Sequence, residues 1–223
     1  ALRFTLAALA IPGMDISLSE ERMAGYQAFA NKIWNASRFV LMNISGEEYS
    51  VAEEELTLAD RWIRSRLARV IQELNAALEE YKFYEAAAKI YHFIWHEFCD
   101  WYVEMVKPAL KADNKSSEAV LVDTLDKILR MLHPFMPFIS EEIWQHLPGS
   151  GKSLTVAAFP VPEEDFIDDN VEREMSFVQQ AVIGLRTIRA ENRIPPKKKI
   201  ELWVRAKDEE KRIMERNKGV IET

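Results

Sequence analysis

The sequence predicts a mainly α protein, with a helical bundle over residues 1–147 and a small α/β unit over residues 148–223. Only 7 of the 223 residues are glycine, and apolar residues recur at the 3.6-residue period of amphipathic helices through the first part. After the linker Pro148-Gly149-Ser150-Gly151, two short segments instead alternate between apolar and polar residues, which is typical of β-strands. These observations predict one larger helical domain and one smaller mixed unit.

Capping residues and prolines delimit the helices of the bundle. A Ser or Thr side chain accepts a hydrogen bond from a free N–H at a helix start, and an acidic residue three positions later completes a capping box. Such signals are Ser17 with Glu20, Thr57 with Asp60, and Ser116 or Ser117. Pro12-Gly13, Pro134 and Pro137 interrupt the helical pattern. The predicted helices cover residues 2–10, 17–43, 57–82, 84–111, 116–133 and 138–147, with an acidic loop at 44–56.

The second unit is predicted to contain two strands and two helices. Asp169, with Glu172 three residues later, starts a helix that reaches Asn192 and stops before Pro195-Pro196. The strands are predicted at residues 153–159 and 200–204, and a charged helix is predicted from Lys207 onward.

Composition narrows the classes of function. The net charge of −7 counts against a nucleic-acid binder held mainly by basic side chains on phosphates, although a small local patch can still read bases. The single cysteine, Cys99, cannot form an internal disulfide and fits a reducing, cytoplasmic setting. No apolar run approaches the roughly 18 residues of a membrane span. The chain starts without Met and without a signal peptide, so we expect it to be a piece of a longer protein.

Two predicted helices carry side chains that do not fit the polar back of a bundle helix. The apolar face of the 17–43 helix comprises Tyr26, Ala30, Ile33, Trp34, Ser37, Val40, Leu41 and Ile44. Lys32, Asn35 and Phe39 fall on the opposite side, where a Phe is unexpected. On the 84–111 helix, the side opposite the apolar face holds His96, Asp100, Val103, Glu104 and Lys107, with Phe93 nearby.

Two explanations fit these faces. In the first, each helix is covered by another element, so that the apolar residues form a second core. In the second, the two helices border a groove for unpaired bases. Bases stack on aromatic side chains, and amide, acidic and basic groups hydrogen-bond their exposed edges. A mixed patch of this kind is compatible with the acidic net charge.

Two further groups of residues have competing explanations. His92 and His96 are four residues apart, so they could bind a metal with Asp100 as a third ligand, or they are simply paired surface histidines. The basic run Lys197-Lys198-Lys199 is either a solvated charged face or a contact to a nucleic-acid backbone. The candidate backbone contacts are Arg186, Arg189, Lys197 and Lys198, with Arg193 close to them.

The chain resembles the valyl-tRNA synthetases of the bacterial type, which are class I aminoacyl-tRNA synthetases. The matching blocks are ALRF and its continuation at 1–10, FANKIWNASRFV at 29–40, LADRWI at 58–63, FIWHEFCDWY at 93–102, LHPFMPFISEEIW at 132–144, and IRAE at 188–191 with the two prolines at 195–196. The resemblance extends over nearly the whole chain. The HPFMPF block is shared with the isoleucine and leucine enzymes, whereas the NASRFV and FCDWY blocks favour valine.

The resemblance implies that the bundle is a class I synthetase anticodon-binding domain that binds the anticodon stem-loop of tRNA(Val). Carried over by position, Phe39 resembles a residue that stacks on an anticodon base, and Lys32 and Val103 resemble its neighbours. Asn35, Asp100 and Glu104 share this face and are included in the expected site.

The resemblance also implies that catalytic and editing domains precede this region in the same chain and that a coiled coil follows it. The parent enzyme is then expected to attach valine to tRNA(Val) with ATP and Mg²⁺. The family's HIGH and KMSKS signatures do not occur in these 223 residues, so we expect no catalysis, cofactor or metal in this part. We further expect a cytoplasmic monomer that does not bind membranes. The alternatives are the corresponding domain of an isoleucine or leucine enzyme, a helical spacer that reads no base, and a metalloenzyme using His92 and His96.

Overall fold

The computed structural model describes residues 1–16, 18–46, 49–195, 198–201 and 203–221, without the side chains of 209 and 220. It contains two compact units, Ala1–Ile167 and Asp168–Thr223. The mainly α prediction is confirmed, because helices dominate both units and no described residue lies in a strand. The strand predicted at 153–159 is wrong: this segment holds a 3₁₀ turn, Leu154–Val156, and the described residues of 200–204 form no strand either. An alternating segment forms a strand only where a second strand pairs with its backbone.

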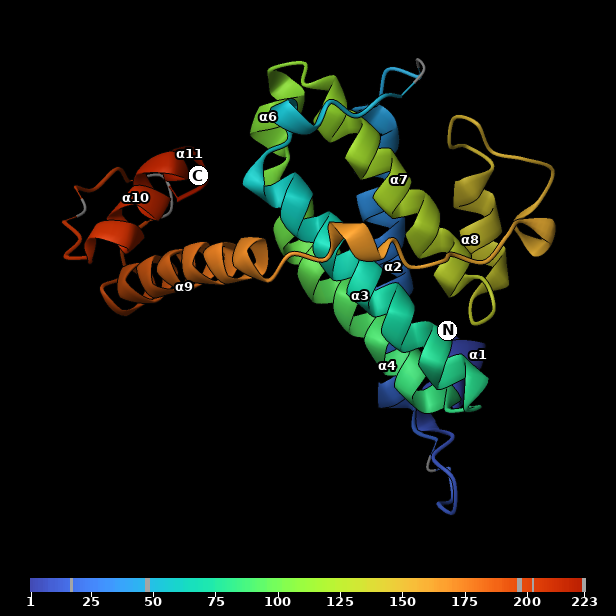
Figure 1. Cartoon of the computed structure of the whole chain (residues 1–223). Helices are drawn as coiled ribbons and strands as arrows, with labels where there is room; N and C mark the ends of the chain where they lie inside the picture. Colours follow the sequence, from blue (N-terminus) through green and yellow to red (C-terminus); the bar gives the residue numbers. More distant parts are fainter. Residues whose placement is uncertain (17, 47–48, 196–197, 202, 222–223) are drawn as a thin grey trace. The chain divides into compact units, whose positions relative to one another are not determined.

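The first unit is a bundle of packed helices (Figure 1). The run predicted at 84–111 is present as a nearly continuous rod in which α-helix gives way to a π-helical segment, η2, and then returns to α-helix. The elements are α1 (Leu2–Leu9), α2 (Glu20–Met42), η1 (Glu53–Glu55), α3 (Leu58–Glu79), α4 (Phe83–His92), η2 (Phe93–Tyr102), α5 (Val103–Met105), α6 (Lys107–Lys111), α7 (Lys115–Leu132), α8 (Pro137–Trp144), η3 (Leu154–Val156) and η4 (Glu164–Phe166).

The capping predictions are confirmed in part. Thr57 and Asp60 form the expected capping box at the start of α3. The cap of α2 is Ser19, whose hydroxyl accepts a hydrogen bond from the Arg22 N–H, and the predicted Ser17 lies outside the described residues. Asn114 caps α7 by accepting from the Ser117 N–H, so the prediction of Ser116 or Ser117 is wrong. Asn precedes the two serines, and its side-chain oxygen serves as a cap equally well.

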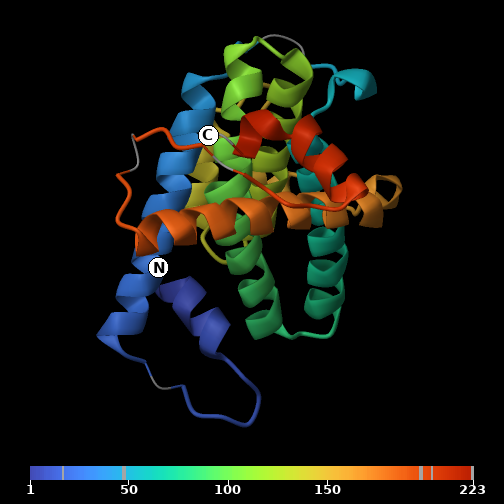
Figure 2. The ribbon, with the colours of Figure 1, turned by 90° about the vertical axis from the view of Figure 1, so that its left-hand side faces the viewer.

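The core lies between the α3–α4 hairpin, η2 and α7, which pack against one another (Figure 2). A buried carboxylate ties three of these elements together. Asp60 of α3 is 0% exposed and accepts hydrogen bonds from the Tyr102 hydroxyl of η2 at 2.8 Å and from the Ser117 hydroxyl of α7 at 2.6 Å. Burial and the Asp60 carboxylate raise the pKa of Tyr102 well above its usual value, so its hydroxyl stays a donor. The capping residue is therefore also the polar centre of the core.

Three helices, α3, α6 and α9, are followed two residues after their last helical residue by a residue with left-handed backbone conformation that is not glycine. The φ angles are 59° at Tyr81, 57° at Asp113 and 50° at Arg193. In each case the N–H of the next residue bonds a carbonyl five residues back, which closes a Schellman turn. These bonds are Lys82 N–H to Ala77 O, Asn114 N–H to Ala109 O and Ile194 N–H to Arg189 O. Such turns usually contain glycine, so the sequence marks them poorly.

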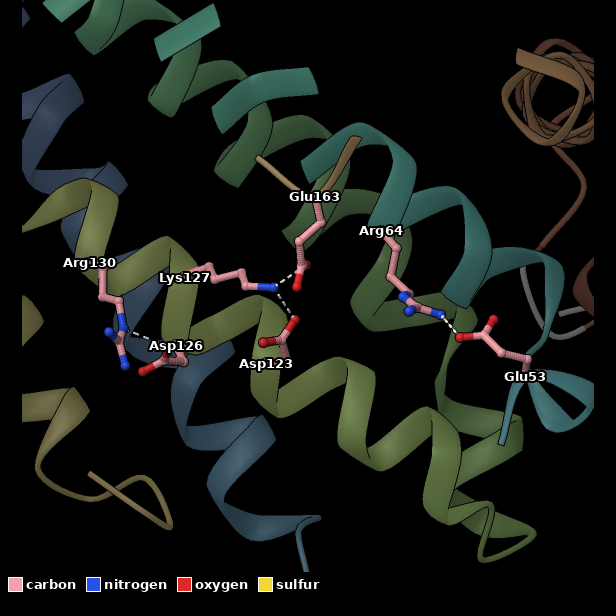
Figure 3. A network of polar contacts seen from close by, with 7 residues as sticks. All are labelled: Glu53, Arg64, Asp123, Asp126, Lys127, Arg130 and Glu163. Carbon is pink, nitrogen blue, oxygen red and sulfur yellow. Dashed lines mark hydrogen bonds and ion pairs between the residues drawn. The ribbon is translucent and has the colours of Figure 1, made fainter. Parts of the chain in front are cut away.

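Ion pairs attach the segment after α8 to the bundle (Figure 3). Lys127 of α7 lies between Asp123, at 2.9 Å, and Glu163 of the attached segment, at 2.5 Å. One turn along α7, Arg130 pairs with Asp126 at 2.7 Å. Lys127 thus bridges a helix and a loop, and its charge separates two carboxylates that would otherwise repel each other.

Contacts to α3 complete this attachment. The Asn75 amide donates to the Pro160 carbonyl at 3.2 Å, and the Arg64 guanidinium lies 3.5 Å from the centroid of the Phe166 ring. Arg64 also pairs with Glu53 at 2.7 Å (Figure 3). These contacts explain why the first compact unit extends to Ile167, whereas the sequence suggests that the bundle ends near residue 147.

A second buried carboxylate, Glu118 of α7, holds the loop that follows α2. It accepts hydrogen bonds from the Ser45 backbone N–H and from the Ser45 hydroxyl at 2.8 Å, and it pairs with Lys115 at 3.3 Å. Burial alone would raise the pKa of Glu118, but the Ser45 and Lys115 donors outweigh it and hold the pKa below its usual value.

We expect Glu118→Gln to lower the free energy of unfolding by about 1–2 kcal/mol near pH 7, because hydrogen bonds to a charged acceptor are lost. The folded state binds the Glu118 proton less tightly than the unfolded chain does. The stabilisation is therefore present above about pH 4.3 and is lost as the pH falls through the lowered folded-state pKa. Urea unfolding of both proteins at pH 7, 5 and 3.5 measures this, and a difference that stays constant over the three pH values would contradict it.

The second unit consists of α9 (Asp169–Glu191), α10 (Asp208–Arg216) and α11 (Lys218–Ile221). Asp168 caps α9 by accepting from the N–H groups of Asn170 and Val171, so the cap predicted at Asp169 is wrong by one residue. Glu174 of α9 pairs with the Arg216 guanidinium at 3.3 Å and accepts from the Asn217 amide at 3.1 Å, which joins α9 to the C-terminal end of α10. No helix in the described parts of the chain is long and apolar enough to cross a membrane.

Candidate functional site

The two helices with anomalous faces are α2 and the rod, which consists of α4, η2, α5 and α6. The α2 helix lies beside η2 in the bundle (Figure 2). We call the surface where they meet the α2/η2 face, and it comprises Lys32, Asn35, Phe39, Trp95, His96, Asp100, Glu104 and Lys107. Five of the six expected anticodon-site residues therefore lie on this face.

Lys32 of α2 is the centre of the contacts across this face. Its ammonium group forms an ion pair with the Asp100 carboxylate and lies 4.2 Å from the centroid of the Trp95 ring. Both partners belong to η2 and are five residues apart. A π-helix bonds residue i to i+5, so its backbone brings positions 95 and 100 to the same side. The pairing of Lys32 with both groups thus depends on the π-helical conformation.

Asp100 is shared between two basic side chains. One carboxylate oxygen faces Lys32, and the other lies 3.4 Å from Nδ1 of His96, one turn away on the same rod. The neighbouring Cys99 is unpaired and half-buried, and burial raises the pKa of its thiol to about 12. Cys99 is therefore an uncharged packing residue rather than a nucleophile.

Phe39 lies farther along α2 and makes a second cluster with the end of the rod. Lys107 Nζ lies 5.3 Å from the centroid of the half-buried Phe39 ring and pairs with Glu104 at 2.6 Å. Asn35 is exposed on the same helix between Lys32 and Phe39. The face thus combines two aromatic rings, an imidazole, two ammonium groups, two carboxylates and an amide, which are the kinds of groups that bind unpaired bases.

Val103 has a different position from its neighbours. Its side chain is 6% exposed, and Phe93 is fully buried. The rod packs against α2 on one side and α3 on another, so it is apolar on more than one side. For these two residues the second-core explanation is therefore the better one.

Comparison with known proteins assigns the chain to a family. The family model described as the anticodon-binding domain of tRNA ligase matches residues 60–204. The chain belongs to this family. Curated relatives named valine–tRNA ligase are 44% identical in Thermotoga maritima, over 99% of this chain and 26% of the relative. They are 48% identical in Fervidobacterium nodosum, over 92% and 24%, and 43% identical in Bacillus cereus, over 94% and 24%. The chain spans about a quarter of the length of these relatives.

A solved structure supports the same fold. The Agrobacterium radiobacter K84 LeuRS, crystallised in a ternary complex with tRNA and LeuAMS, superposes with a TM-score of 0.58 at 20% sequence identity. The alignment covers 75% of this chain and 20% of that chain. At this level of identity the likeness shows a shared fold and nothing more.

The basic residues of the second unit of this anticodon-binding domain have distinct positions. The Arg189 guanidinium donates to the carbonyls of Pro195 and Lys198 at 2.6 and 3.0 Å, so it braces the turn after α9. Arg186 and Lys198 are exposed. Lys197 lies outside the described residues. Three of the four candidate backbone contacts, Arg186, Arg189 and Lys198, thus lie among the described residues.

The metal alternative finds no support in the anticodon-binding domain. His92 and His96 have ring centroids 5.1 Å apart, but each faces a different carboxylate, Glu97 and Asp100 respectively. Among the described residues, no group of three or more His, Cys, Asp or Glu side chains could hold a metal ion.

Sequence reasoning does not assign Trp95 to the site, although Lys32 contacts it. An α-helical period of 3.6 residues places Trp95 well away from Asp100, and only the π-helical period brings them together. The one available signal is the unusual density of aromatic residues in FIWHEFCDWY.

Proposed function

We propose that the chain binds the anticodon stem-loop of tRNA(Val), as the anticodon-binding part of a valine–tRNA ligase. The observation that carries this proposal is the match to the anticodon-binding family over residues 60–204, together with relatives named valine–tRNA ligase at 43–48% identity. The α2/η2 face supplies the chemistry that such binding requires.

In this proposal the α2/η2 face binds unpaired anticodon bases. The Phe39 ring stacks on one base, which is worth about 1–3 kcal/mol. Asn35 and Glu104 hydrogen-bond base edges, Lys32 and Lys107 supply local positive charge, and Asp100 positions the Lys32 ammonium group. Because the bases are bound through these few groups, an overall charge of −7 is no obstacle.

The second unit contributes contacts to the RNA backbone in the same proposal. Arg186, Lys197 and Lys198 contact phosphates, and Arg189 holds the backbone of Pro195 and Lys198 in place. Phosphate contacts position the RNA and carry no sequence information, so these residues add affinity for any tRNA.

The whole protein, in this proposal, attaches valine to tRNA(Val) with ATP and Mg²⁺ through domains in the remaining three-quarters of the relatives' length. This chain then holds no catalytic residue and binds no cofactor. It works as a cytoplasmic monomer whose partners are tRNA(Val) and the catalytic and editing domains of its own chain.

We expect Lys32→Met to weaken binding of a tRNA(Val) anticodon stem-loop about tenfold at low salt, because a cation is lost and Asp100 is left facing the RNA. Fluorescence anisotropy with labelled stem-loops measures this. The matched control is Lys152→Met, which removes an exposed lysine outside the α2/η2 face and should leave affinity within about twofold. Equal affinities of the two variants would contradict the role of the α2/η2 face.

The same titration separates the alternative functions. A domain from an isoleucine or leucine enzyme prefers the corresponding stem-loop over that of tRNA(Val). A helical spacer binds every stem-loop with equal and weak affinity.

A further inference from the structure

The Asp100 carboxylate has a partner on each oxygen, and only one of these is permanently charged. Lys32 of α2 pairs with one oxygen, and Nδ1 of His96 lies 3.4 Å from the other. Histidine is the side chain whose charge changes between pH 5 and 8. The charge around Asp100 therefore depends on the protonation of His96.

Binding of RNA at Lys32 disturbs this arrangement. In the free protein the Lys32 charge is largely neutralised by Asp100. When the ammonium group turns to an RNA phosphate or base, the carboxylate loses its partner and faces a polyanion. The Asp100 carboxylate and an RNA phosphate bound by the neighbouring Lys32 repel each other. The site therefore needs a second cation beside Asp100.

We propose that His96 is a further residue of the RNA-binding site, which as an imidazolium takes over the Asp100 carboxylate when Lys32 turns to the RNA. The proton comes from the buffer and is released again when the RNA leaves. His96 is thus a positioning residue that acts through Asp100 and Lys32. This inference rests on the proposed RNA binding of the α2/η2 face.

The surroundings of His96 fit this role. Its side chain is 51% exposed, so buffer can supply the proton. The charged or titratable groups in contact with it are Asp100, His92 and Tyr91 on its own rod, and Lys32 from α2 is linked to it through Asp100. Asp100 is the only acid of this set. The Tyr91 ring lies edge-on to the imidazole, with 6.4 Å between the ring centroids.

The other flank of the rod provides a matched comparison. Glu97 is bound by Arg66 of α3 through two hydrogen bonds, at 2.8 and 3.1 Å, and lies 3.4 Å from Nδ1 of His92. His92 is 67% exposed and stands one turn before His96. Its carboxylate partner remains held by Arg66 when RNA binds at Lys32, so His92 should take up no proton.

The test measures the affinity of the protein for a tRNA(Val) anticodon stem-loop between pH 5.5 and 8, for wild type, His96→Gln and His92→Gln. As the pH rises from 5.5 to 8, the affinity of wild type and of His92→Gln should fall about tenfold, because one proton is bound together with the RNA. His96→Gln should be nearly independent of pH. Calorimetry in buffers of different ionisation enthalpy should detect proton uptake by wild type and none by His96→Gln.

Asp100→Asn gives an independent readout. This change frees Lys32 without leaving a carboxylate behind, so binding at pH 8 should be tighter than in wild type and independent of pH. Thermal unfolding at each pH confirms that every variant is folded.

Equal pH dependence of His96→Gln and His92→Gln would overturn the inference. So would the absence of proton uptake by wild type while Lys32→Met still weakens binding, and in that case the proposed function would stand without it. If Lys32→Met bound as wild type does, the proposed role of the α2/η2 face would fail first.

Discussion

Asp60→Ala is expected to lower the free energy of unfolding by about 4 kcal/mol. The Asp60 carboxylate completes the capping box of α3 by accepting from the Thr57 N–H, and it also accepts hydrogen bonds from Tyr102 of η2 and Ser117 of α7. Removing it leaves the buried hydroxyls of Tyr102 and Ser117 without their acceptor, each at a cost of about 1–3 kcal/mol, and removes the Asp60 half of the capping box, worth up to about 1 kcal/mol. The loss is large because three elements share one carboxylate that is 0% exposed.

Chemical denaturation followed by circular dichroism measures this effect. Tyr102→Phe removes a single hydrogen bond and should cost about 1–1.5 kcal/mol. Arg61→Ala changes the exposed neighbour in the sequence and should stay within about 0.5 kcal/mol of wild type. A loss for Asp60→Ala no larger than that for Arg61→Ala would show that the buried cluster does not hold the core together.

Phe39→Ala is expected to weaken binding of a tRNA(Val) anticodon stem-loop about thirtyfold, which corresponds to about 2 kcal/mol for the stacking of one base. The variant also removes the ring beneath Lys107, so that lysine loses its position on the face. The protein itself should lose little stability, because the ring is only half-buried.

Two variants control for the nature of the effect. Phe39→Tyr keeps an aromatic face and should retain most of the affinity. Phe138→Ala removes a ring that is 87% exposed elsewhere in the unit and should bind like wild type. If Phe39→Ala and Phe138→Ala bind the stem-loop with equal affinity, the prediction that a base stacks on Phe39 is wrong.

Several elements of the fold could be predicted because their signals are local. The Thr57–Asp60 capping box, the proline interruptions and the helical periods locate α1, α2, α3 and α7 within a few residues. The conformation of residues 153–159 could not be predicted correctly. Alternation of apolar and polar residues suggests a strand, but it occurs equally well in a loop that is fixed by side-chain contacts. The added role of Asp60 depends on Tyr102 and Ser117, which are distant in sequence and meet it only in the folded core.

The α2/η2 face could be predicted only as two separate helix faces. The 3.6-residue period places Lys32, Asn35 and Phe39 correctly on α2, but Trp34, expected on its apolar face, is exposed. On the rod the same period assigns Val103 and Phe93 to the polar side, whereas both are buried. The contacts of Lys32 with Trp95 and Asp100 require the π-helical backbone and the packing of α2 on η2, neither of which is encoded in a local pattern.

The central claim is that the α2/η2 face is the surface that binds RNA. Nuclear magnetic resonance of the isotopically labelled chain, titrated with a tRNA(Val) anticodon stem-loop, tests this most directly. We predict that the largest shift changes occur at residues 32–39 of α2 and 95–107 of the rod, and that they decrease in Phe39→Ala. Changes confined to α7, α8 or the second unit, with the α2/η2 face unaltered, would contradict the claim.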